Sequence, residues 1–201
     1  METRNIKPEP ARFLVLLPHR DSLLPQENLR TKLFAAGFKG AYSFPPVALL
    51  AALSAPLDRN ELKEAARGIR NATVAKVGKI SAGNIDAVII PASDNIVLAG
   101  PELDLPALND ISFIMEEKTS AKIIHIFQKV ILCAAIMDSA ADLTGIQTAA
   151  GPMQPFSFRA AVVTNLAIRP LEDGVFPYSL EWRLGPECWL PKNKEKRLTQ
   201  S

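Results

Sequence analysis

The segment from Ser43 to Arg70 restricts the fold of this chain more than any other. Its first half contains an apolar run, residues 47–53, with two prolines before it, which is typical of a buried strand whose proline-bearing start lies outside the hydrogen-bonded ladder. Asp58 then stands three residues before Glu61, the spacing of a capping box, and a helical pattern follows. The segment therefore predicts a strand, a short loop and a capped helix.

Further apolar runs, separated by turn residues, predict more strands and helices. Residues 12–18 predict an opening strand. A helix is expected over residues 25–36, because proline is tolerated in a first turn and Gly37 suits the position after a helix end. Three later runs have strand character and suggest an antiparallel meander: residues 72–80, 85–91 and 95–100.

From Ser120 onward the apolar residues follow a helical spacing. Counted from Ile123 they fall at i, i+4, i+7, i+8 and i+11, which predicts a central helix reaching residue 134. A Gly- and Pro-interrupted connection over residues 144–155 leads to strands expected within 156–170 and 178–184.

Strands that cluster between helices, instead of alternating regularly with them, predict an α+β protein. We expect two lobes of antiparallel sheet plus helices around a central cleft. The expected organisation is one bilobal domain over residues 1–201, with a flexible leader at 1–10 and a flexible tail at 192–201.

Composition excludes several classes of function. The 23 basic and 21 acidic residues among 201 give a formal charge of +2, too even a balance for extended DNA binding. The first ten residues lack the apolar core of a signal peptide, and the run at 130–137 is too short for a bilayer of ~30 Å, so we expect a cytoplasmic protein with no membrane contact. Cys133 and Cys188 have no metal-ligand spacing and are expected to be free, buried thiols, and no cofactor or metal is predicted.

Three segments together resemble the 2H phosphoesterase superfamily, which contains 2′-5′ RNA ligase-like proteins and cyclic phosphodiesterases: residues 13–18, 45–66 and 157–170. The resemblance implies two lobes around a cleft, each contributing one His-x-Thr/Ser strand. Both motifs are degenerate in this chain. Pro46 and Ala48 replace the first, and either Val163 with Asn165 or, one residue earlier, Val162 with Thr164 replaces the second.

Loss of both imidazoles removes the groups that exchange protons near neutral pH. We therefore expect a catalytically degenerate protein. The chain has two histidines. His125 is expected on the solvated side of the predicted central helix. His19 directly follows the opening strand, and an active phosphoesterase that uses a non-standard acid–base pair including His19 is the competing hypothesis.

The second motif strand keeps polar residues on one face. Arg159, Asn165 and Arg169 alternate with residues expected in the core, and guanidinium groups suit phosphate or carboxylate oxygens. We expect them to form an anion-binding wall in the cleft, with Tyr42 or His19 opposite. The alternative is that these arginines are solvated at the strand ends.

The first motif strand offers an apolar face to the same cleft: Pro46, Ala48, Leu50 and Ala52. A cleft with one arginine wall and one apolar wall would hold an amphipathic anion. The ligand classes left open are a nucleotide, an RNA end and a small carboxylate. A cleft closed by side-chain packing would instead belong to a structural or protein-interaction module.

Overall fold

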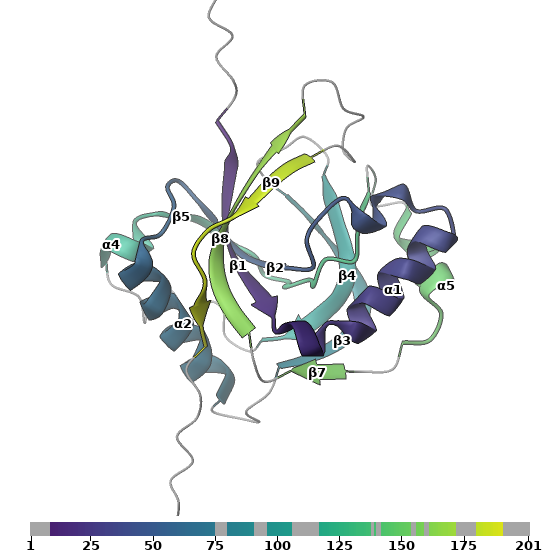
Figure 1. Ribbon diagram of the computed structural model, residues 1–201, viewed down its shortest axis with the longest axis horizontal. Helices are drawn as coiled ribbons and strands as arrows, with labels where there is room; N and C mark the ends of the chain where they lie inside the picture. The colour runs from purple at the N-terminus through teal and green to yellow at the C-terminus, as the bar shows by residue number, and fades with distance from the viewer. Residues whose placement is uncertain are drawn as a thin grey trace, which may run out of the picture.

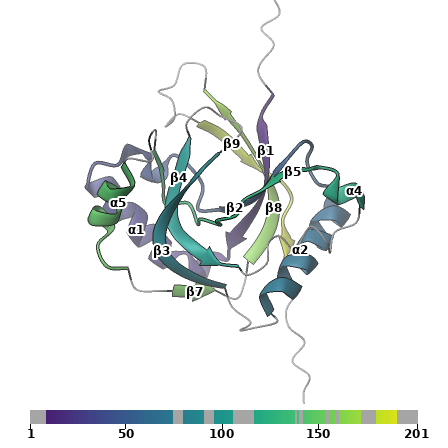
Figure 2. The same ribbon diagram turned by 180° about the vertical axis from the view of Figure 1, so that it is seen from behind.

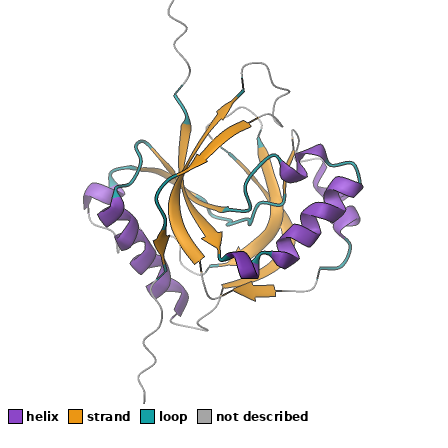
Figure 3. Ribbon diagram, in the orientation of Figure 1, coloured by secondary structure: helices purple, strands orange, loops and turns teal. Residues whose placement is uncertain are grey.

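The chain is α+β, as predicted. The computed structural model describes residues 9–74, 80–90, 96–105, 117–137, 139, 142–153, 156–158, 161–171 and 180–190. Strands occupy the centre of the molecule, with α2 and α4 on one side and α1 and α5 on the other (Figures 1 and 3). In chain order the elements are β1 (Ala11–Pro18), η1 (Arg20–Ser22), α1 (Leu24–Ala35), η2 (Lys39–Tyr42), β2 (Ala48–Leu53), α2 (Arg59–Val74), β3 (Ile80–Ile89), β4 (Val97–Asp104), α4 (Glu117–Ser120), β5 (Ile123–Ile126), β6 (Ala135–Met137), α5 (Leu143–Ala150), β7 (Phe156–Phe158), β8 (Ala161–Pro170), β9 (Leu180–Leu184) and β10 (Cys188–Trp189).

The strands form two antiparallel sheets. One has six strands in the order β10-β8-β1-β2-β5, with β9 also pairing with β8, and the other has four in the order β6-β4-β3-β7. The view from behind shows β3 and β4 curving past β2 and β8 (Figure 2).

Both sheets contribute to one buried core cluster. Phe13 of β1 and Leu166 of β8 come from the six-stranded sheet, and Leu98 of β4 and Ile136 of β6 come from the four-stranded sheet. All four side chains are at most 2% exposed. Apolar packing therefore joins the two sheets.

Helices cover the remaining apolar faces. On α2, the residues at i, i+3, i+4 and i+7 face the core cluster that contains Ala161 and Val163 of β8: Leu62, Ala65, Ala66 and Ile69. Helices α1 and α5 bury apolar side chains with Val97 and Ala99 of β4 in a third cluster. Successive side chains of β4 thus point to opposite faces, since Leu98, between Val97 and Ala99, points to the other sheet.

Local sequence signals located the early elements well. The strands predicted at 12–18 and 47–53 and the helix predicted at 25–36 match β1, β2 and α1 to within one residue at each end. The capping box is present: the Asp58 carboxylate accepts a hydrogen bond from the Glu61 N–H at 3.0 Å, and the Glu61 carboxylate accepts one from the Asp58 N–H at 2.6 Å. Helix α2 continues to Val74, so the strand expected over 72–80 is wrong for its first three residues, and residues 75–79 lie outside the described chain.

The central helix predicted over residues 120–134 is wrong. This segment forms β5 and then an extended stretch that lies between β2 and β4. The Cys133 N–H donates to the Val47 carbonyl oxygen at 3.0 Å, and the Leu132 N–H donates to the Pro101 carbonyl oxygen at 2.9 Å. Both sides of this stretch are buried, so its apolar residues are nearly continuous and show no strand period.

Close backbone approach explains one glycine beside this stretch. A Cβ at Gly100 of β4 would lie 2.0 Å from the Leu132 carbonyl oxygen. The glycine therefore allows the extended stretch to lie against β4. Two buried polar side chains of α1 hold nearby backbone: Gln26 donates to the Leu132 and Cys133 carbonyl oxygens at 3.0 and 2.6 Å, and Arg30 donates to the Ala41 carbonyl oxygen at 2.7 Å.

Two other predictions need correction. The connection predicted over 144–155 contains α5, because Ile146 and Ala150, one turn apart, are buried in the cluster with α1. The apolar face predicted for β2 is interrupted by a bulge: Leu14 and Val15 pair with Ala51 and Leu49, which leaves Leu50 as the extra residue. Ala52 consequently packs in a different core cluster from Ala48 and Leu50.

Candidate anion-binding pocket

Asn165 is held in the structure by the loop before α2. Its side-chain oxygen accepts a hydrogen bond from the Leu57 N–H at 2.9 Å, and its side-chain nitrogen donates to the Leu57 carbonyl oxygen at 2.8 Å. The side chain leaves β8 on the face that carries Ala161 and Val163, which are buried with α2. Asn165 therefore fixes this loop against the sheet.

Arg169 is paired within the sheet. It lies opposite Glu181 of β9, and its Nε donates to the Glu181 carboxylate at 2.6 Å. The side chain of Arg169 is 35% exposed. The Glu181 carboxylate therefore already neutralises this half-buried guanidinium. Arg159 lies outside the described residues.

Tyr42 and His19 lie elsewhere in the fold. The Tyr42 hydroxyl forms a hydrogen bond with Thr31 of α1 at 2.8 Å, and the Arg30 guanidinium carbon lies 4.8 Å from the centre of its ring. The His19 ring lies 5.4 Å from the Trp189 ring, just beyond the end of β1. The structure does not bring the described members of the predicted site together. His125 is exposed, as predicted, but on β5 and not on a helix.

A pocket nevertheless opens beside Asn165, and two other arginines line it. Arg12 of β1 and Arg183 of β9 both lie opposite Ala167 of β8. Directly paired residues of antiparallel strands share a face, and two strand spacings amount to roughly 10 Å. The two arginines therefore leave the same face of the sheet on either side of the small Ala167 side chain. The volume is about 570 Å³.

The rest of the pocket is mainly apolar. Its remaining lining residues are Pro56, Leu57, Asn165, Leu166, Ala167, Leu184, Gly185 and Pro186. None of these described lining residues is acidic, and none is a histidine or a cysteine. The pocket thus combines two guanidinium groups with an uncharged wall.

The two guanidinium groups are weakly neutralised by the described part of the chain. Arg12 contacts Glu9 at 3.6 Å, and the Glu9 side chain is 88% exposed. An ion pair that is so exposed to water contributes ~0–1 kcal/mol to stability. Arg183 is exposed, and no hydrogen bond or ion pair joins its guanidinium to another residue that the structure describes. Both groups are available to an anion.

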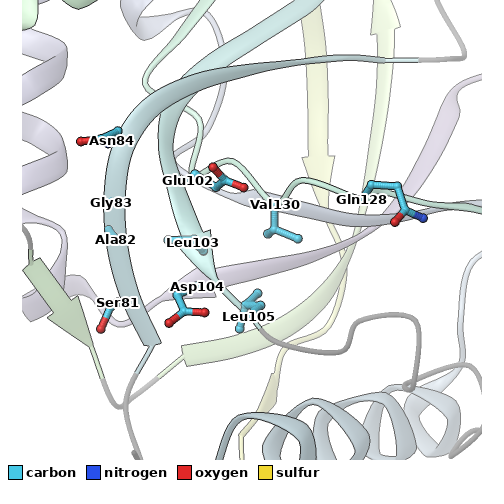
Figure 4. A pocket seen from close by; sticks show the side chains of 10 residues that line it. All are labelled: Ser81, Ala82, Gly83, Asn84, Glu102, Leu103, Asp104, Leu105, Gln128 and Val130. Carbon is cyan, nitrogen blue, oxygen red and sulfur yellow. The ribbon is translucent and has the colours of Figure 1, made fainter.

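A second pocket, of about 510 Å³, has the opposite character. It lies along β3 and β4 beside residues 128–130, and Glu102 and Asp104 are among its lining side chains (Figure 4). The ladder between β3 and β4 shifts register here, between Ala82 and Ile85. Two carboxylates repel an anion, so this pocket does not fit the predicted ligand. Among the described residues there is no group of three or more His, Cys, Asp or Glu side chains that could hold a metal ion.

Four ionisable side chains of the described residues have shifted pKa values for clear reasons. Hydrogen bonds from the backbone N–H groups of Glu61 and Asn60 lower the pKa of Asp58. The hydrogen bond from Lys129 lowers the pKa of Asp86, and the same pair raises the pKa of Lys129. Complete burial raises the pKa of Cys133 to about 12. Both cysteines are free, as predicted, although Cys188 is only half-buried. None of these groups lines the arginine pocket.

No protein-family model matches this sequence, and no curated protein matches it. Within the described part of the chain, none of the helices combines the length and the apolar character that crossing a bilayer requires.

Sequence reasoning identified the face of β8 that lines this pocket, through Asn165, but missed both arginines that give it charge. Arg12 precedes the apolar run of the opening strand, and Arg183 alternates with Trp182 and Leu184. This alternation in β9 indicates that the Arg183 side chain leaves the face of the strand opposite to that of Trp182 and Leu184. Its position beside Arg12 depends on the register of three strands.

Proposed function

We propose that this protein binds a small organic anion, a phosphate monoester or a carboxylate, between Arg12 and Arg183. The observation that carries the proposal is the placement of two guanidinium groups on the same face of three adjacent strands, one on each side of Ala167. Guanidinium groups form charge-assisted, often bidentate hydrogen bonds with the oxygens of such ligands.

The charges around the pocket support binding of an anion. Two positive groups on the same face, separated by the single strand β8, repel each other unless a negative charge lies between them. Arg169, two residues along the same face, is neutralised by Glu181, whereas the partner of Arg12 among the described residues, Glu9, is distant and exposed. A bound anion would supply the missing negative charge.

The lining chemistry supports binding over acid–base catalysis. General acids and bases must reach the reacting group within hydrogen-bond distance. His19 follows β1 at the end opposite Arg12, and seven residues of extended chain span roughly 23 Å. Descent from a 2H phosphoesterase, with two lobes around a cleft and both catalytic motifs lost, is the evolutionary hypothesis that accompanies this proposal.

Calorimetric titration with inorganic phosphate, AMP and acetate tests the proposal. Each charge-assisted hydrogen bond contributes roughly 1.5–3 kcal/mol. The Arg12→Gln/Arg183→Gln variant should therefore bind the preferred anion about tenfold or more weakly. The matched control is Arg20→Gln/Arg67→Gln, which removes the same charge from exposed positions outside the pocket and should bind normally.

Two results would contradict the proposal. One is equal affinity in the two double variants, and the other is no binding by the wild type. Binding should also weaken at high ionic strength, because the Debye length falls from about 10 Å at 0.1 M to about 3 Å at 1 M salt.

The competing enzyme hypothesis has its own assay. We expect no turnover of RNA 2′,3′-cyclic phosphates or cyclic nucleotides above the background rate. Robust turnover that His19→Ala abolishes would favour an active phosphoesterase and would place its chemistry away from the arginine pocket.

A further inference from the structure

We infer that the arginine pocket selects anions that carry an apolar body, and that Asn165 is the positioning residue that holds the apolar wall. This inference rests on the proposed function, because it concerns the ligand class of the same site. The expected ligand is an aryl or alkyl phosphate, or a carboxylate of similar shape, with its charged group between Arg12 and Arg183.

The size of the pocket is the first reason. Its volume of about 570 Å³ falls within the range of small-molecule sites. A water molecule takes up ~30 Å³ in the liquid, so an inorganic anion with a few oxygens would leave most of the pocket to solvent. A ligand with an organic body fills the space and removes apolar surface from water.

The chemistry of the wall is the second reason. Apart from the two arginines and Asn165, every lining residue is apolar or glycine, and two of them are prolines with a fixed backbone angle: Pro56 and Pro186. Both prolines are exposed, whereas Leu57 is buried and the Leu184 side chain packs against the core cluster on the other face of the sheet. The two proline rings therefore offer apolar surface to a ligand, and their fixed backbone angle limits the freedom of this wall.

Asn165 connects the two sides of this wall. Its side chain makes two hydrogen bonds with the Leu57 backbone, at 2.9 and 2.8 Å. Its own carbonyl oxygen accepts a hydrogen bond from the Gly185 N–H at 2.8 Å. A Cβ at position 185 would lie 3.3 Å from the Asn165 Cβ, so glycine leaves the Asn165 side chain undisturbed.

The side-chain amide and the backbone carbonyl oxygen of Asn165 thus both form hydrogen bonds with other backbone groups. Asn165 therefore supports the wall and does not contact the ligand. Loss of its side chain would free the Pro56–Leu57 loop without removing charge from the pocket. The arginines would still bind a bare anion, but the apolar body would lose its wall. Asn165 should consequently affect the choice between ligands more than the binding of phosphate itself.

The test compares inorganic phosphate with phenyl phosphate by calorimetry on the full chain. Phenyl phosphate should bind the wild type about tenfold or more tightly, since a tenfold gain requires covering only roughly 55 Å² of apolar surface. Pro186→Ser, which removes an exposed apolar ring from the pocket, should lose most of this preference while phosphate affinity stays within about twofold. Leu24→Ser removes an exposed leucine at the start of α1 and should keep the preference.

Asn165→Ala should also reduce the preference for phenyl phosphate, with phosphate affinity retained. If that variant does not fold, as shown by its circular dichroism spectrum, Pro186→Ser decides the question alone. Equal affinities for both ligands, with both lost in Arg12→Gln/Arg183→Gln, would overturn this inference and leave the proposed function standing. A preference for phenyl phosphate that Pro186→Ser leaves intact would also overturn it. Absence of any binding would overturn the proposed function and this inference together.

Discussion

Replacement of Gly100 by alanine should destabilise the protein strongly, because the backbone of another segment occupies the space of the new Cβ. That Cβ would lie 2.0 Å from the Leu132 carbonyl oxygen and 3.0 Å from the Ala134 nitrogen. Relief of the overlap requires the extended stretch to move away from β4. Such a movement disrupts the hydrogen bonds from the Leu132 N–H to Pro101 at 2.9 Å and from the Ala134 N–H to Ala99 at 2.8 Å.

The expected cost follows from these contacts. Overpacking in a core costs about 1–3 kcal/mol, and each hydrogen bond contributes roughly 1 kcal/mol. Gly100→Ala should therefore lower the free energy of unfolding by about 3 kcal/mol. With an m-value of about 2 kcal/mol per M, the urea midpoint falls by about 1.5 M.

Gly83→Ala is the matched control. A Cβ at Gly83 of β3 would meet only the Glu102 carbonyl oxygen, at 3.6 Å, which is an ordinary contact. Alanine also restricts the unfolded chain more than glycine does, so the urea midpoint should stay unchanged or rise slightly. If Gly100→Ala unfolds at the same urea concentration as Gly83→Ala, the extended stretch does not lie on β4.

The remaining predictions concern ionisation, thiol access and helix capping. The stabilisation from the Lys129–Asp86 pair should be present between about pH 5 and 9. It should be lost as pH falls through the pKa of Asp86, which is lowered from its ordinary value of 3.8, and as pH rises through the pKa of Lys129, which is raised above 10.5. Urea melts of the wild type and Asp86→Asn between pH 3 and 11 measure this. A difference in unfolding free energy that stays constant over this range would contradict the prediction. At pH 8, Ellman's reagent should modify Cys188 alone in the native protein and both cysteines in guanidinium chloride. Cys133 should not react in the native protein because it is buried and its pKa is about 12. Rapid modification of Cys133 in the native protein would refute its burial. Asp58→Ala should cost about 1 kcal/mol in urea unfolding through loss of the cap on α2, and no change would indicate that the cap does not contribute.

Local interactions explain why the sequence alone located the first half of the fold. The capping box, the proline in the first turn of α1 and the short apolar runs act between residues a few positions apart. Their effects are therefore visible in the order of the residues. The residues that alternate with Asn165 and Arg169 were expected in the core, and Thr164, Leu166 and Ile168 are at most 3% exposed.

The stretch from residue 123 to residue 134 required tertiary structure. Its apolar spacing fits a helix, but β2 and β4 offer backbone hydrogen bonds to it from both sides, as those of Cys133 and Leu132 show. A strand that is buried on both faces has no alternation, and periodicity cannot distinguish it from a buried helix. The partners that decide its structure are distant in the sequence.

The pocket depends on tertiary structure for the same reason. The polarity of the β8 face was readable from the alternation around Asn165, but the partner of Asn165 is Leu57, 108 residues away. Arg12 and Arg183 become neighbours of one site only because β1 and β9 both place them opposite Ala167. A shift of one residue in either register would turn its arginine to the other face of the sheet. The sequence by itself thus determined the polar face of β8, and strand pairing decided which arginines meet beside it.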